Sequence, residues 1–295
     1  MRYKSYSWIL KTLAAFWIID ALLEFQPKMF SAFLGSNILK STIYNQPKVI
    51  ADIIQNSVHL LLLHPALYNA IFGFIELLIG ILLFTKKGYK TGLILSIFWS
   101  LFIWIFGEGM GNLFTRQALI STGAPGAGLI YALISLAIYL FQKRSIGFVI
   151  NWFKYSIFGY YLLAILLILS SFMNPRMNLA SSILNNAQNS PGIISKLDYW
   201  VSHFLNSSSD LIILMTILIY LFLMFAVFFN QRIRNIAIYL GIILALFFWV
   251  VAQNFGGILI FEATDPNSAP LIIFLLLIFK FFASSKAALN KSTRV

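Results

Sequence analysis

Apolar residues run along this chain in long, almost uninterrupted stretches that short polar segments separate. A helix that crosses a lipid bilayer needs about 20 mostly apolar residues, and eight stretches approach this length. The pattern therefore predicts an all-α integral membrane protein with eight transmembrane helices. The predicted spans are residues 7–25, 66–84, 91–107, 126–142, 147–172, 209–229, 237–254 and 268–283.

The first stretch follows Arg2 and Lys4 and so resembles a secretory signal peptide. It is longer than the apolar core of such a peptide, it lacks a cleavage site of small residues, and an equivalent stretch recurs in mid-chain. We therefore expect it to remain in the protein as a helix.

The second half of the chain repeats the first. Placing Trp104 on Trp249 also places Glu108 on Gln253. Because each copy has an even number of predicted spans, the copies point the same way and are related by an axis along the membrane normal. A difference between the copies indicates a specialised site. We expect two units of four transmembrane helices each, residues 1–145 and 146–295.

Two long segments between spans, residues 26–65 and 173–208, carry apolar residues at helical spacing. In the first segment Pro47 suits the first turn of a helix, and polar residues recur at steps of three to four on one face, including Asp52 and His59. Each segment is therefore predicted to contain an amphipathic helix that lies in the membrane interface or caps the bundle.

Composition agrees with a membrane protein, since 60% of the residues are hydrophobic, 10% are charged and the mean hydropathy is +0.86. The net charge of +12 does not indicate nucleic-acid binding, because the basic residues lie in short turns without interleaved aromatic residues. The lipid bilayer is the expected partner. The chain has no cysteine, which excludes disulfides, thiolate metal sites and iron–sulfur clusters.

The position of the charges predicts the orientation. If the N-terminus is cytoplasmic, the segments on that side hold many Lys and Arg residues and no Asp or Glu, whereas the outer segments hold both signs. This distribution meets the positive-inside rule. We expect a multi-pass protein of the plasma membrane with both termini in the cytoplasm.

Three acidic residues fall within the first two predicted spans. Glu76 is deep in the second span, while Asp20 and Glu24 share one face of the first. A charge at the centre of a bilayer costs at least about 2.5 kcal/mol and persists only if it is paired, protonated or facing a cavity. The second copy has no acids at the matching places, so the first half alone is predicted to handle protons within the membrane. The structural alternative is a protonated acid that hydrogen-bonds neighbouring helices.

The third span ends in a glycine-rich segment that contains Glu108 and pairs with residues 249–257. Glycines permit a close backbone approach or a positive φ. Gln253 keeps the hydrogen bonding of Glu108 without its charge, which indicates a shared structural role with an added ionic one in the first half. The alternative is a turn followed by a helix cap. The candidate ligand-binding residues are Gly107, Gly109, Gly111, Gln253, Asn254 and Arg116.

Histidine is scarce, and His59 and His203 are equivalent in the repeat. A two-fold axis could bring them together as a bis-imidazole site for haem or copper. This alternative is disfavoured, because matched histidines more often anchor interfacial helices. No motif of hydrolytic or nucleotide-driven enzymes is present.

The chain resembles prokaryotic multi-span proteins described as DoxX-like. The resemblance rests on FWIID at 16–20, QPKMF at 26–30, FGEG at 106–109, GAPG at 123–126 and TDPN at 264–267. Each half is also similar to one unit of the DoxX/DoxD superfamily, which includes the large subunit of thiosulfate:quinone oxidoreductase. The resemblance implies membrane redox work with a quinone or a partner subunit. Glu76 departs from the pattern, since Gln is expected there, and the link to thiosulfate has only Lys28, Arg116 and Arg176 to support it.

Three hypotheses follow. The first is a subunit of a respiratory or redox membrane complex that interacts with quinone and other subunits, in which Asp20, Glu24, Glu76 and Glu108 line a polar pocket and Glu76 or Glu108 accepts a proton. The second is a small-solute or proton-coupled transporter. The third is a non-catalytic scaffold subunit of a membrane enzyme complex.

Overall fold

The computed structural model describes residues 2–171, 179–207 and 209–292, and within these ranges it contains helices and no strands. The prediction of an all-α membrane protein agrees with five helices that are long and apolar enough to cross a membrane. Counting the bent pair Gly192–Asn206 and Leu211–Ala226 as one span raises this number to six. The five are α3 (Pro65–Phe84), α4 (Tyr89–Phe106), α6 (Ile146–Ser171), α10 (Gln231–Val251) and α11 (Ser268–Ser292).

Three further helices occupy the remaining predicted windows. Helix α5 is apolar but shorter than the five, and α1 carries charged residues near both of its ends. These helices are α1 (Arg2–Glu24), α5 (Ala127–Lys143) and α9 (Ser209–Ala226).

The outer surface of the helices is apolar, as expected where lipid replaces water. Phe74 on α3 is 62% exposed, Phe98 on α4 is 69% exposed and Ile243 on α10 is 63% exposed. Local signals set where helices begin. Pro65 occupies the first turn of α3, and the Asn230 side chain accepts a hydrogen bond from the Ile233 N–H at the start of α10.

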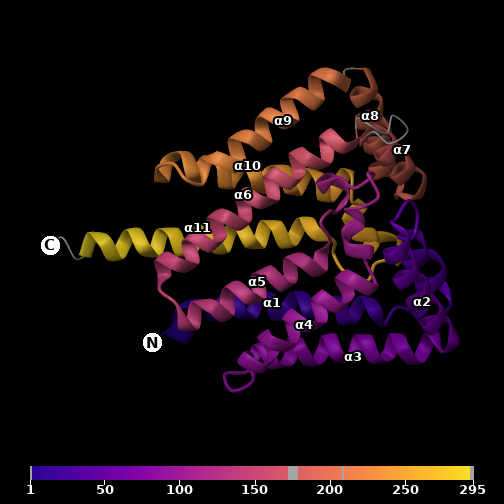
Figure 1. Cartoon of the computed structure of the whole chain (residues 1–295), viewed down its shortest axis with the longest axis horizontal. Coiled ribbons are helices and arrows are strands. Elements are labelled where there is room, and N and C mark those ends of the chain that lie inside the picture. Colours follow the sequence, from indigo (N-terminus) through magenta and orange to yellow (C-terminus); the bar gives the residue numbers. More distant parts are fainter. Residues whose placement is uncertain (1, 172–178, 208, 293–295) are drawn as a thin grey trace.

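The helices pack in the same pairwise order in both halves. Helix α1 packs on α3, α3 on α4 and α4 on α5, and in the second half α6 packs on α9, α9 on α10 and α10 on α11 (Figure 1). Helix α11 also contacts α5 and α6, and its Phe274 ring lies 6.3 Å from the ring of Trp8 in α1. Helices of both halves therefore share one apolar interior.

The two ends of the bundle differ. The start of α1, the end of α11 and the short connections α3–α4, α5–α6 and α9–α10 lie at one end (Figure 1). The opposite end, called the distal end below, carries α2 (Lys48–Leu63), α7 (Leu179–Asn189) and α8 (Gly192–Ser207). Helices α2 and α8 begin directly after Pro47 and Pro191, so the two predicted amphipathic helices are confirmed.

Candidate functional site

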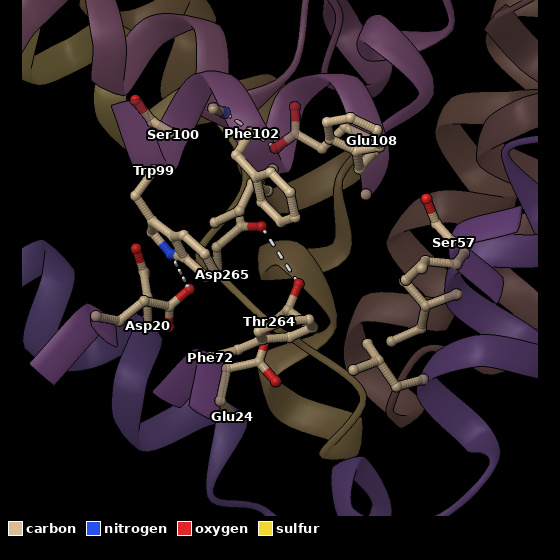
Figure 2. Close-up of a pocket in the computed structure, with 18 of the residues that line it drawn as sticks. Asp20, Glu24, Ser57, Phe72, Trp99, Ser100, Phe102, Glu108, Thr264 and Asp265 are labelled. Carbon is tan, nitrogen blue, oxygen red and sulfur yellow. Dashed lines mark hydrogen bonds between the residues drawn. The ribbon is translucent and has the colours of Figure 1, made fainter. Parts of the chain in front are cut away.

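A cavity of about 490 Å³ lies in the first half of the chain, towards the distal end. Residues of α1, α2, α3, α4 and the first turns of α5 line it, and most of the lining is apolar. The four acids that the sequence marked as candidates, Asp20, Glu24, Glu76 and Glu108, all line this cavity. Figure 2 shows three of them around the same space.

Asp20 and Glu24 both come from the last turns of α1 and are buried. Oδ2 of Asp20 accepts a hydrogen bond of 2.5 Å from the Tyr131 hydroxyl, whereas Oδ1 has no partner among the described residues. The backbone carbonyl of Glu24 accepts a hydrogen bond of 2.6 Å from the Asn69 side chain. Oε2 of the Glu24 carboxyl has no partner in the described chain. Each acid therefore keeps a buried oxygen that lacks a hydrogen-bond partner among the described residues.

Glu76 projects into the cavity from α3 and is 3% exposed. Its Oε1 accepts a hydrogen bond from the Trp99 indole over 3.4 Å, which is long for such a bond. Its Oε2 is buried without a partner in the part of the chain that the structure describes. Glu76 thus joins α3 to α4 through one long hydrogen bond and keeps its second oxygen without a described partner.

Glu108 follows α4 and caps α5. Its Oε1 accepts a hydrogen bond of 2.9 Å from the Gly128 N–H in the first turn of α5. Burial, followed by the nearby Asp265 carboxylate, raises the pKa of Glu108 to about 8. Oε2 has no partner among described residues and lies so close to Gly126 that a Cβ there would collide with it. Glu108 therefore combines a cap with a second, buried carboxyl oxygen that has no hydrogen-bond partner among described residues.

Gln253 makes the equivalent cap in the second half, where its Oε1 accepts a hydrogen bond of 3.2 Å from the Ala269 N–H of α11. The shared hydrogen-bonding role that was predicted for Glu108 and Gln253 is therefore present. Gln253 and Asn254 are buried, but they do not line the cavity.

The backbone takes the same path in the loop after α4 as in the loop after α10. The Trp104 indole donates to the Pro125 carbonyl over 2.7 Å, and the Trp249 indole donates to the Pro266 carbonyl over 2.8 Å. Gly111 has a φ of +62°, and a Cβ there would collide with the Pro125 carbonyl. This close approach of the two backbone segments fixes the loop that positions Glu108. Gly111 is therefore needed for backbone packing and does not line the cavity.

The other candidate ligand-binding residues have different surroundings. Gly107 lines the cavity, whereas Gly109, with a φ of +55°, offers its carbonyl to Gln46 at 2.9 Å outside it. Arg116 is exposed and does not line the cavity. Lys28 forms a salt bridge of 2.8 Å with Glu262, and Arg176 lies outside the described residues.

The two histidines do not lie in this site. His59 is exposed on α2, and His203 is exposed on α8. The described residues contain no group of three or more His, Asp or Glu side chains placed to hold a metal ion.

Asp265 is a residue of the site that the sequence did not place there. It belongs to the loop between η5 (Asn254–Ile260) and α11, and with Thr264 it reaches the cavity of the first half (Figure 2). Its Oδ1 accepts a hydrogen bond of 2.5 Å from the Asn267 N–H. Burial raises the pKa of Asp265. In the sequence, Asp265 stands out only as part of the TDPN motif at 264–267, which gives no sign that it meets the acids of the first half.

The described lining of the cavity contains five carboxyl groups and no Lys, Arg or His. Five carboxyl groups around one cavity cannot all remain ionised without a counter-charge. The site can therefore hold exchangeable protons, or a cation, beside an apolar molecule.

No family model, no curated protein and no solved structure matches this chain.

Proposed function

We propose that the protein is a membrane subunit of a redox complex that binds a quinol or quinone in this cavity and takes up its protons on the carboxyl groups. The observation that carries the proposal is that Asp20, Glu24, Glu76 and Glu108 each keep a buried oxygen without a described partner in one largely apolar cavity. An apolar pocket with a few converging polar groups is the usual form of a small-molecule site.

Aromatic rings along one wall suit a flat ring. The Trp99 and Phe102 rings stack at 5.2 Å with an angle of 15° between their planes, and the Phe106 ring follows Phe102 at 4.8 Å. All three line the cavity. A quinone ring can lie against this wall, with its oxygens directed to the carboxyl groups.

The same wall reaches the outside of the bundle. Phe102 is 43% exposed and Phe106 is 37% exposed, although both line the cavity. On a helix that is surrounded by lipid, such residues join the cavity to the apolar phase. We infer that the ligand enters sideways from the membrane and that its apolar tail remains near Phe102 and Phe106.

Quinol oxidation releases protons as well as electrons, and a carboxylate within hydrogen-bond reach is the group that accepts such protons. The residues of this chain supply the proton acceptors and the apolar walls. The electrons would pass to a partner subunit of the same complex, which is why we propose a subunit rather than a complete oxidoreductase.

The proposal includes eight spans, in two DoxX-like units that cover residues 1–145 and 146–295 and point the same way. Its support is the equal order of helix contacts in both halves, the paired Trp104 and Trp249 hydrogen bonds, and the sequence resemblance. Basic residues gather in the short connections at the end where α1 begins. The positive-inside rule then places both termini in the cytoplasm and the distal end outside.

A second candidate is a proton-coupled transporter for an apolar organic cation. The observation that favours it is the combination of five carboxyl groups, no described basic residue and aromatic walls in one lining, since aromatic faces and carboxylates both attract cations. The redox proposal ranks above it, because the aromatic wall opens sideways at Phe102 and Phe106 and so suits a molecule that stays in the membrane.

The test is binding to the purified full-length protein in lipid nanodiscs, with the fluorescence of Trp17 and Trp99 in the cavity wall as the signal. We expect saturable quenching by decylubiquinone and a quinone in the lipid extract of the protein. Phe102→Ala should weaken binding about tenfold through loss of the stacking wall. The matched control is Phe98→Ala, one turn earlier on α4 and 69% exposed, which should bind like the wild type.

Equal quinone affinity of the two variants, or the absence of saturable quenching, would contradict the proposed quinone site. Saturable binding of tetraphenylphosphonium that acid reverses would favour the transporter instead. Stable isolation with other subunits and no bound small molecule would favour the scaffold hypothesis.

A further inference from the structure

We propose that Glu108 and Asp265 form the exit through which protons leave the cavity for water at the distal end. The inference rests on the proposed function, because a ligand in the cavity supplies the protons. It adds a route and assigns a role to Asp265, which comes from the second half of the chain.

A second cleft, of about 470 Å³, adjoins the cavity at the distal end. Its walls are polar where those of the cavity are apolar, so the cleft suits water. Side chains that line the cleft but not the cavity include Ser41, Thr42, Asn112, Gln117 and Asn267.

Glu108 and Asp265 line both spaces. Asp20, Glu24 and Glu76 line only the cavity, and Glu262 lines only the cleft. Among the described acids, Glu108 and Asp265 are therefore the pair that stands between the apolar site and the polar cleft. In the view of Figure 2 the Asp265 side chain lies between those of Asp20 and Glu108.

The surroundings of the pair favour proton exchange. Tyrosines and acids line the two spaces beside it: Asp20 and Glu24 from α1, Tyr68 and Glu76 from α3, Tyr131 from α5, Tyr44, and Glu262, which is paired with Lys28. No Lys, Arg or His occurs in the described lining of either space. A pKa of about 8 for Glu108 lies near neutral pH, where a carboxyl group both accepts and releases protons readily.

The step is a transfer between oxygens. A proton leaves a carboxylic acid deep in the cavity, and its O–H bond breaks as a new one forms at the ionised Glu108. The proton then passes to Asp265 or to water in the cleft, and Glu108 returns to its carboxylate form. The unpartnered Oε2 of Glu108 is the atom that is free to take it.

Both halves are needed for this exit. Asp265 reaches the first half on a loop that also carries Glu262, and Glu262 bonds Lys28 of η1 (Pro27–Phe30) over 2.8 Å. Two residues after Asp265 on this loop, the Asn267 side chain lies against Gly123. A Cβ at position 123 would collide with the Asn267 side chain. The second half therefore supplies a group of the site although its own spans carry no matching acids.

The test is the rate of hydrogen–deuterium exchange at the deep carboxyl groups, measured by infrared spectroscopy on the ligand-free protein in nanodiscs. Transfer to heavy water shifts the C=O stretch of each protonated carboxyl group, and Glu76→Gln identifies the Glu76 band. We expect the double variant Glu108→Gln with Asp265→Asn to slow the exchange of that band by about tenfold or more.

The matched control is Asp52→Asn, which removes a carboxylate from the exposed face of α2 and should leave the rate unchanged. Glutamine at position 108 should preserve the cap, because Gln253 caps α11 in the same manner. The pair Glu108→Asp with Asp265→Glu keeps both carboxyl groups and should restore most of the rate.

An unchanged rate in the double variant would overturn the exit, and so would equal slowing by Asp52→Asn. The measurement needs no quinone. A failure of quinone binding and a failure of the proton route therefore give different results, and each is measured without the other.

Discussion

Tyr131 and Asp20 join α5 to α1 through one hydrogen bond of 2.5 Å, in which the phenol donates to Oδ2 of the carboxyl group. Both side chains are almost fully buried, and the Tyr131 ring also packs 4.4 Å from the ring of Trp17. This contact fixes one wall of the cavity and orients Oδ1 of Asp20, which has no described partner.

Replacing Tyr131 with Phe should destabilise the protein. The variant keeps the ring but leaves both carboxyl oxygens of Asp20 buried without a donor, which costs about 1–3 kcal/mol. Denaturant unfolding in detergent, followed by circular dichroism, measures the change in the free energy of unfolding. Tyr155→Phe is the matched control, because Tyr155 is 66% exposed and its variant should unfold like the wild type.

Alanine at Gly126 should be poorly tolerated, and alanine at Gly159 should be harmless. Gly126 has a φ of +103° and faces Oε2 of Glu108, whereas a Cβ at Gly159 meets nothing within 4 Å. We expect Gly126→Ala to lower the free energy of unfolding by at least about 1 kcal/mol through backbone strain. Gly159→Ala, inside α6, should raise it by up to about 1 kcal/mol. Similar thermal unfolding temperatures for the two variants would contradict this assignment.

The stability of the protein should fall as pH rises towards 8. The folded state raises the pKa of Glu108 from its ordinary 4.5 to about 8. Between these values the folded protein holds a proton that the unfolded chain releases. The stabilising contribution is therefore complete below pH 4.5 and is lost as pH rises through about 8.

Glu108→Gln removes this titration, so its free energy of unfolding should depend less on pH across the same window. The difference in slope between wild type and variant, from denaturant unfolding at several pH values, isolates the contribution of this residue. We expect a change of at least about 1 kcal/mol across the window. Parallel curves would show that Glu108 ionises as it does in the unfolded chain.

The orientation can be tested with single cysteines, because the chain has none of its own. Tyr44 is 71% exposed at the distal end, and Lys87 is exposed in the α3–α4 connection at the opposite end. We expect a membrane-impermeant thiol reagent to label Tyr44→Cys on intact cells and to label Lys87→Cys only after permeabilisation. The opposite pattern would reverse the proposed orientation.

Local patterns were sufficient for most of the helical architecture. Long apolar stretches predicted the five helices that meet the length and hydropathy of a span, and helical spacing after Pro47 and Pro191 predicted α2 and α8. Such signals lie within one element, so they survive in the sequence. The count of eight spans stays a prediction, because α5 is short and charged residues interrupt α1.

Some residues of the site can be identified from the sequence alone, and others cannot. An ionisable residue inside an apolar stretch is conspicuous on its own, so the sequence predicts Asp20, Glu24 and Glu76 as candidate site residues without knowledge of the fold. By contrast, the sequence predicts Gly109 and Gly111 as ligand-binding residues, whereas the structure shows positive φ values that suit backbone contacts outside the cavity.

The sequence by itself determined that this is a helical membrane protein whose first half carries acids within apolar stretches, since hydropathy and the position of an ionisable residue are both read along the chain itself. Only the tertiary structure decided that these acids share one cavity and that Asp265 joins them from the other half. That meeting depends on packing between segments far apart in the chain, and no local spacing of residues encodes it.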